Sequence, residues 1–159
     1  MTNPKKYRPL RDAFGQFATG VTVITARSEA GQPIGLTANS FASVSLEPAL
    51  VSWCVDEAST RYKEFIEAKF YSISILTAEQ ESVSNLFAER SWDDTVFDDI
   101  DWYWGLNEIP QIEGVATRFH CQTQQIYQGG DHKIILGEIL EYETDPREPL
   151  LFFQGDYRR

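Results

Sequence analysis

The stretch from Gly35 to Pro48 reads GLTANSFASVSLEP. Between residues 37 and 45, small polar side chains mix with single apolar ones, and neither helical nor strand periodicity is kept. Such a composition is typical of a loop or a short bent strand. Its small side chains leave the backbone accessible, so we predict a segment whose backbone is held close to another group.

The residues on both sides of this stretch predict strands. Residues 21–26 are rich in β-branched side chains, and a turn with glycine and proline separates them from a returning strand over residues 34–36. After the stretch, residues 49–55 predict a buried strand. An amphipathic helix is expected over residues 10–19, ending at Gly20.

The rest of the chain continues in the same way, without an internal repeat or a linker. Helices are expected over residues 61–69 and 79–89, strands over 70–76 and 150–153, and a hairpin from long strands over 115–127 and 133–143. Alternation along residues 70–76 predicts that Ser72 and Ser74 face away from Tyr71 and Ile73. Residues 91–110 are acidic and aromatic without clear periodicity, and we interpret them as a long surface excursion.

These elements predict a fold that is mainly β with peripheral helices. The helices are scattered among hairpins and do not alternate regularly with strands, which argues against a doubly wound parallel sheet. A count of roughly six or seven strands and three helices suggests a closed β-barrel with the helices outside it. At 159 residues the chain has the length of one domain, so residues 1–159 are expected to form a single domain.

Composition excludes several classes of function. The net charge of −10 argues against a nucleic-acid partner, and the pairs Lys5-Lys6 and Arg158-Arg159 are too short for a phosphate-binding patch. No apolar run approaches the roughly 20 residues of a membrane span. Cys54 and Cys121 lie far apart without metal-ligand spacing, so no metal site is expected. Free thiols and the absence of a signal-like N-terminus predict a cytoplasmic protein.

Familiar nucleotide and hydrolase motifs are missing from the sequence. There is no G-x-G-x-x-G after a strand and no G-x-S-x-G elbow. Residues 15–20 have the glycine spacing of a P-loop, but Val21 stands where the phosphate-binding lysine belongs. The aspartates of residues 93–101 do not match an EF-hand, so a solvated acidic loop is expected there.

Four segments together resemble the flavin reductase-like family, the reductase components of two-component flavin-dependent monooxygenases. They are residues 17–25, residues 35–48, Trp53-Cys54-Val55-Asp56 with Ser59 shortly after, and Gly130-Asp131-His132 followed by Leu136-Gly137-Glu138. Their order and spacing also fit the family, and the match extends over nearly the whole chain.

The resemblance implies an FMN-binding split β-barrel, usually a homodimer with flavin sites near the subunit interface. Members of the family use NADH or NADPH to reduce FMN or FAD by hydride transfer, and they commonly release reduced flavin to a partner monooxygenase. We therefore expect an NAD(P)H:flavin oxidoreductase. No Arg or Lys cluster is placed for a 2′-phosphate, which favours NADH slightly.

By family likeness, the flavin phosphate, the ribityl chain and the ring edge are assigned to Thr37, Ala38, Asn39, Ser40 and Ser43. Consecutive backbone N–H groups and short hydroxyls can replace the water around an anion without blocking its approach. Taken alone, the same residues are also compatible with a polar loop that caps a strand.

Val55, Asp56 and Ser59 resemble the family segment that lines the other side of the flavin site. A carboxylate beside a phosphate is unfavourable, so the backbone of Asp56, or its use as an N-cap of the next helix, is the alternative. Ser59 is equally compatible with a helix cap.

His132 follows a glycine turn, and the resemblance implies that it lies near the nicotinamide and the flavin. Hydride transfer needs no general acid, so His132 is expected to act as a positioning or electrostatic group; a turn histidine in water is the alternative. Tyr157 either contacts the ligand or closes the barrel. Cys54 is expected to be inert, because no cationic residue flanks it to lower its pKa.

Two other functions stay open at this point. The chain is also compatible with a non-catalytic FMN-binding split-barrel protein. It is equally compatible with a flavoprotein that keeps its flavin and reduces a different acceptor, such as a metal or a corrinoid.

Overall fold

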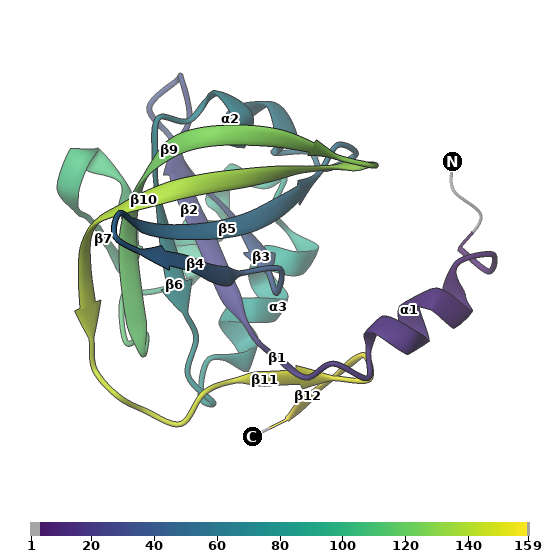
Figure 1. The fold of residues 1–159 in the computed structure, drawn as a ribbon. Coiled ribbons are helices and arrows are strands. Elements are labelled where there is room, and N and C mark those ends of the chain that lie inside the picture. Colours follow the sequence, from purple (N-terminus) through teal and green to yellow (C-terminus); the bar gives the residue numbers. More distant parts are fainter. Residues whose placement is uncertain (1–3, 159) are drawn as a thin grey trace.

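The computed structural model describes residues 4–158, so residues 1–3 and Arg159 of the expected domain lie outside the described part. Figure 1 shows its elements. The helices are α1 (Arg8–Phe14), α2 (Tyr62–Glu67) and α3 (Glu81–Glu89), with two 3-10 helices, η1 (Asp94–Asp99) and η2 (Leu106–Glu108). The strands are β1 (Thr19–Gly20), β2 (Thr22–Arg27), β3 (Pro33–Ala38), β4 (Ala42–Leu46), β5 (Ala49–Asp56), β6 (Phe70–Ile75), β7 (Trp102–Trp104), β8 (Pro110–Ile112), β9 (Thr117–Gly129), β10 (His132–Thr144), β11 (Leu151–Phe153) and β12 (Asp156–Arg158).

The main sheet has seven antiparallel strands in the order β3-β2-β6-β9-β10-β5-β4. The predicted long hairpin is its centre, because β9 and β10 pair along nearly their whole length. Short strands form two smaller sheets, β1-β11-β12 and β7-β8. The prediction of a mainly β fold with peripheral helices is confirmed (Figure 1).

The main sheet curls without closing within residues 4–158. β3 and β4 stand at opposite ends of the strand order and share no ladder, so the expected closed barrel is corrected to a split barrel. The chain leaves the sheet after β3, and side-chain contacts hold this opening instead of backbone pairing. There Ser40 Oγ accepts a hydrogen bond from the Cys54 N–H at 2.9 Å and donates to the Cys54 carbonyl at 3.3 Å.

The first helix is shorter than predicted. α1 ends at Phe14, because the following residues turn toward the C-terminal hairpin, where Thr19 pairs with Phe152. The N–H of Gln154 also donates to the carbonyl of Gly15 at 2.9 Å. No residue of α1 is buried, and Figure 1 shows this helix standing away from the sheets.

The predicted surface excursion packs against the main sheet instead. Val96 and Phe97 are buried, and so is β8, which lies against β6. Ser72 donates a hydrogen bond to Gln111 Oε1 at 3.2 Å. Both faces of β6 are therefore covered, and Ser74 is as buried as Ile73.

A close approach between α3 and β3 brings this helix to the open edge of the sheet. Phe87 is fully buried and forms an edge-on ring contact with Phe97, with centroids 5.1 Å apart. Gly35 makes the approach possible, because a Cβ at that position would lie 2.7 Å from the Phe87 ring. The end of α3 is thus seated beside the strand that leads into residues 35–48.

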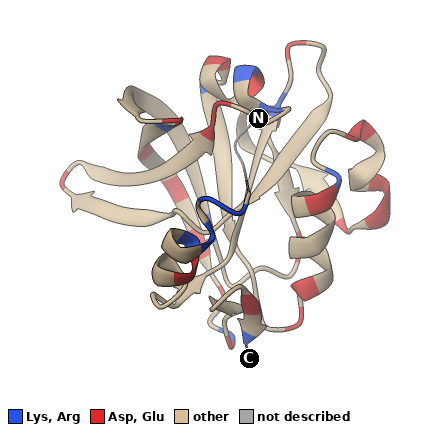
Figure 2. Ribbon diagram, turned by 90° about the vertical axis from the view of Figure 1, so that its right-hand side faces the viewer, with Lys and Arg blue, Asp and Glu red and all other residues tan. Residues whose placement is uncertain are grey.

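The lengths of the helices and the placement of the charged residues are two further features of the fold. None of the helices in the described part of the chain is long and apolar enough to cross a membrane. Figure 2 shows Lys and Arg in short segments, and Asp and Glu at many other places in the same view.

Candidate functional site

A cleft of about 540 Å³ lies where the sheet opens, between the ends of β3 and β5, the end of α3 and the turn before β10. Most of the residues predicted for flavin binding line this cleft. They are Thr37, Ala38, Asn39, Ser40, Val55, Asp56, Ser59 and His132. Segments far apart in the sequence therefore converge on one concave surface.

Strand pairing accounts for the convergence of β5 and β10. Their antiparallel register places His132 directly opposite Asp56, and Lys133 opposite Val55. The N–H of Glu57 donates to the Asp131 carbonyl at 3.0 Å, which ties the hairpin turn to the segment after β5. The histidine is held at the cleft by backbone geometry.

Thr37 is fixed from the opposite side of the cleft by α3. Its hydroxyl donates to the carbonyl of Ser84 at 2.6 Å. This bond joins the start of the predicted binding segment to the helix whose end forms the facing wall. Because the Thr37 hydroxyl is engaged in this bond, the backbone of residues 37–40 is the principal polar surface that this segment offers to a molecule in the cleft.

Asp56 and Ser59 form a turn before α2. Asp56 Oδ1 accepts from the Ala58 N–H at 2.8 Å, and the Asp56 carbonyl accepts from the Ser59 N–H at 3.0 Å. The suggested N-cap role of Asp56 is wrong, because the residue that precedes α2 is Arg61. Ser59 Oγ instead accepts from the Arg61 N–H at 3.2 Å.

His132 is paired with its neighbour Asp131. Nδ1 of the imidazole lies 2.7 Å from Asp131 Oδ1, and the histidine side chain is 40% exposed. The hydrogen bond with His132, together with its charge, lowers the pKa of Asp131 below the ordinary value. With Nδ1 engaged, Nε2 is the ring nitrogen available to a molecule in the cleft.

Ser43 and Tyr157 are the predicted site residues that do not line the cleft. Ser43 lies on β4, opposite Val51, and is exposed. The Tyr157 ring packs on Phe152 with centroids 5.4 Å apart, and its hydroxyl lies 2.7 Å from Ser84 Oγ. Tyr157 thus joins the C-terminal hairpin to α3.

Seven further residues line the cleft that sequence reasoning did not assign to it, namely Leu36, Cys54, Phe87, Ala88, Ser91, Gly129 and Ile134. The helical pattern of residues 79–89 indicated that Phe87 packs in the core, but it did not indicate that Phe87 also lines a cleft. Ser91 begins the segment interpreted as a surface excursion, and nothing in its local sequence indicates a binding role.

The lining combines apolar side chains with short hydroxyls. Leu36, Val55 and Ile134 offer apolar surface, whereas Ser40, Ser59 and Ser91 offer hydroxyls. No Lys or Arg of the described chain lines the cleft. Such a surface suits a flat, mostly apolar ring with a polar tail that is bound through backbone N–H groups and hydroxyls.

Cys54 is also among the residues that line this cleft. Burial raises the pKa of Cys54, and a hydrogen bond with Ser40 opposes part of that shift. A raised pKa leaves little thiolate at neutral pH, in agreement with the expectation of an inert cysteine.

Comparisons with known proteins identify the family to which this chain belongs. The family model described as the flavin reductase like domain matches residues 14–159. An FMN reductase (NADH), SmoA, of Agrobacterium fabrum is 42% identical over 152 residues, which are 96% of this chain and 85% of that protein. The reductase component of the flavin-dependent trigonelline monooxygenase of Acinetobacter baylyi is 43% identical over 96% of this chain, but the chain spans only about half (48%) of its length.

A solved structure gives the same result in three dimensions. The NADH:FAD oxidoreductase SgcE6 of Streptomyces globisporus, in complex with NAD and FAD fragments, superposes with a TM-score of 0.90 at 40% sequence identity. The similarity covers 100% of this chain and 95% of that one. Because sequence and fold agree along the whole described length, this chain belongs to the flavin reductase-like family.

Proposed function

We propose that this chain is an NAD(P)H-dependent flavin reductase, which reduces FMN or FAD by hydride transfer and supplies reduced flavin to a partner monooxygenase. The observation that carries the proposal is the cleft at the open edge of the sheet, lined by residues 37–40, residues 55–59 and His132. The names of the relatives, an FMN reductase and an NADH:FAD oxidoreductase, support both flavins as substrates and NADH as the reductant.

The cleft fits a flavin in size and in chemistry. Its volume of about 540 Å³ lies within the range of sites for molecules of this size. Among residues 4–158, Asp56 is the one acidic residue that lines it, and that carboxylate is already bound to the Ala58 N–H at 2.8 Å. A phosphate would therefore be bound by backbone N–H groups of residues 37–40 and by the hydroxyl of Ser59.

The residues of the cleft divide the work of the reaction. When bound, the flavin supplies the redox chemistry, because it accepts the hydride of the nicotinamide. Leu36, Phe87 and Ile134 exclude water from the ring. His132 orients the nicotinamide through Nε2, while Asp131 holds Nδ1 at 2.7 Å. Ser43 and Tyr157 lie outside the cleft and act, in this proposal, through the strands that carry them.

We also propose a homodimer and a cytoplasmic location. Large apolar side chains are exposed on β4 and on β10, including Leu46 at 96% and Tyr142 at 68%, which supports a contact with a second copy. The cysteines Cys54 and Cys121 are both unpaired, which supports a reducing compartment. Light scattering of the purified protein and fractionation of expressing cells test these two points.

The test of the activity is oxidation of NADH and of NADPH, followed by the loss of absorbance of the reduced nicotinamide, with FMN, with FAD and with no added flavin. Oxidation that depends on added flavin is the expected result, with NADH the better reductant. Flavin binding without oxidation would contradict the proposal and would favour the non-catalytic or alternative-acceptor function. Absorbance of flavin that stays with the protein through gel filtration separates a retained flavin from a diffusing one.

A further inference from the structure

One buried arginine joins the two walls of the cleft. Arg61 is 8% exposed and lies between the Ser59 turn and α2. Its backbone N–H donates to Ser59 Oγ at 3.2 Å, and its guanidinium Nε donates to the Ser91 carbonyl at 2.6 Å. Ser59 and Ser91 both line the cleft, from the wall after β5 and the wall after α3 respectively.

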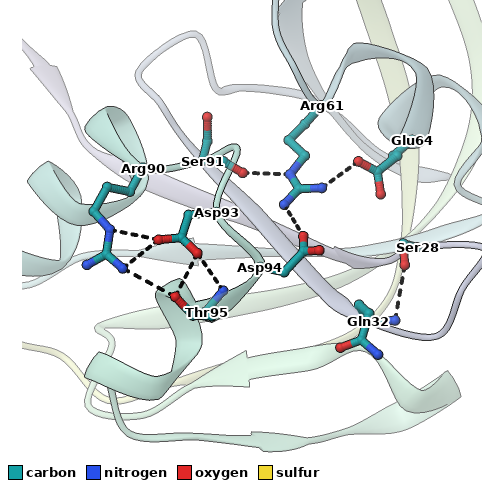
Figure 3. Close-up of polar contacts among 9 residues, drawn as sticks. All are labelled: Ser28, Gln32, Arg61, Glu64, Arg90, Ser91, Asp93, Asp94 and Thr95. Carbon is teal, nitrogen blue, oxygen red and sulfur yellow. Dashed lines mark hydrogen bonds and ion pairs between the residues drawn. The ribbon is translucent and has the colours of Figure 1, made fainter.

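The remaining donors of Arg61 are engaged by carboxylates. Nη1 donates to Glu64 Oε1 at 2.7 Å, and Nη2 donates to Asp94 Oδ1 at 2.5 Å (Figure 3). Glu64 lies on α2, whereas Asp94 begins η1. Arg61 itself does not line the cleft. Because its three nitrogens are all bound to protein groups, the guanidinium is committed to holding two segments together and not to binding a phosphate.

A second arginine, Arg90 at the end of α3, provides a natural comparison. The Arg90 guanidinium also binds two carboxylates, Asp93 at 2.7 Å and Asp99 at 2.9 Å. Asp93 in turn accepts from the Thr95 N–H at 2.8 Å (Figure 3). These contacts stabilise the loop after α3, but the Arg90 guanidinium bonds to no residue of the cleft.

We propose that Arg61 is a positioning residue for the flavin, which sets the separation of Ser59 and Ser91 and thereby the width of the cleft. The inference rests on the proposed flavin reductase function. A planar guanidinium can bind the Ser91 carbonyl and both carboxylates at once, whereas a lysine ammonium on a flexible stem cannot reproduce that fork. A widened cleft binds the flavin less tightly, and by the same amount in the ground state and in the transition state of hydride transfer. KM for flavin therefore rises while kcat is unchanged.

The experiment measures the Kd for FMN by quenching of FMN fluorescence in wild type, Arg61→Lys, Arg90→Lys, Ser91→Ala and Arg61→Lys/Ser91→Ala. We expect Arg61→Lys to raise Kd about five- to tenfold and to leave kcat at saturating FMN within about twofold. Arg90→Lys, the comparison variant, should raise Kd clearly less than Arg61→Lys does, because its guanidinium bonds to no residue that lines the cleft. The double variant should weaken binding by less than the sum of the two single effects, because Arg61 places the Ser91 hydroxyl by holding the Ser91 carbonyl, which Ser91→Ala keeps.

Three results would overturn the inference while wild type binds FMN and oxidises NADH. They are an unchanged Kd in a folded Arg61→Lys, an equal effect of Arg90→Lys, and fully additive effects in the double variant. If Arg61→Lys does not fold, Asp94→Asn replaces it, because that carboxylate is 61% exposed; an unchanged Kd there is equally contrary. A wild type that binds no FMN would instead refute the proposed function, and this inference with it.

Discussion

The hydroxyl of Tyr157 lies 2.7 Å from the hydroxyl of Ser84, and this contact joins β12 to α3. Ser84 is fully buried, and its carbonyl also accepts a hydrogen bond from Thr37. The C-terminal hairpin is therefore connected through one serine to the segment that begins the proposed flavin site. Tyr157, predicted either to contact a ligand or to close the barrel, connects the C-terminal hairpin to α3 and does not line the cleft.

Tyr157→Phe is accordingly expected to lower stability more than flavin affinity. Removal of the phenol leaves the Ser84 hydroxyl buried without a partner, which costs about 1–2 kcal/mol of the free energy of unfolding. Urea unfolding measures this loss. The double variant Tyr157→Phe/Ser84→Ala should recover part of it, since neither partner is then left unsatisfied. Weaker FMN binding at unchanged stability would show that Tyr157 contacts the ligand.

His132→Ala should reduce turnover with little effect on FMN affinity. The imidazole is one of many groups that line the cleft, but in the proposal it alone orients the nicotinamide. We expect kcat with NADH to fall roughly ten- to a hundredfold, by misplacement of the hydride donor. Steady-state kinetics and FMN fluorescence measure the two effects separately. Asp131→Asn, which keeps the size of the neighbour that holds Nδ1, should give a smaller decrease in kcat; full activity of His132→Ala would refute the assignment.

Cys54 allows the flavin site to be located without measuring activity. Because burial raises the pKa of Cys54, the thiolate fraction and the rate of alkylation by iodoacetamide should increase as pH is raised above neutrality. Bound FMN should slow this reaction, since Cys54 lines the cleft. Mass spectrometry of alkylated peptides follows it. Cys121 serves as the internal control, because burial raises its pKa to about 12 and it should remain unmodified. Equal rates with and without FMN would place the flavin elsewhere.

Gly35→Ala should damage both the core and the cleft. The added Cβ would lie 2.7 Å from the buried Phe87 ring, so α3 must shift away from β3. Overpacking of this kind costs about 1–3 kcal/mol of the free energy of unfolding, and FMN affinity should fall because Phe87 lines the cleft. Thermal unfolding and FMN titration measure the two effects. Gly20→Ala is the matched control, because no atom lies within 4 Å of its added Cβ; equal losses in both variants would contradict the packing argument.

Much of the fold was predictable from local spacing. Strands of the main sheet were found where the sequence predicted them, at the β-branched run before the Gly35–Pro48 stretch and at the buried segment after it. The glycine turn of the long hairpin also lies where it was predicted, between β9 and β10. The end of α1 was not predictable, because pairing of Thr19 with Phe152 depends on a strand at the far end of the chain. Burial of Val96 and Phe97 was missed for a similar reason, since their segment has no periodicity of its own.

The amino-acid sequence by itself determined the strand pattern, the family and the segments that supply most of the cleft, because spacing and motif record local backbone geometry and the side chains on it. Only the tertiary structure decided that Ser91 lines the cleft opposite Ser59 and that the Arg61 guanidinium binds the Ser91 carbonyl. Arg61 and Ser91 are linked by this hydrogen bond although they are 30 positions apart in the sequence. Such a contact depends on how α2 and α3 pack on the sheet, and packing over that separation leaves no periodic trace in the chain.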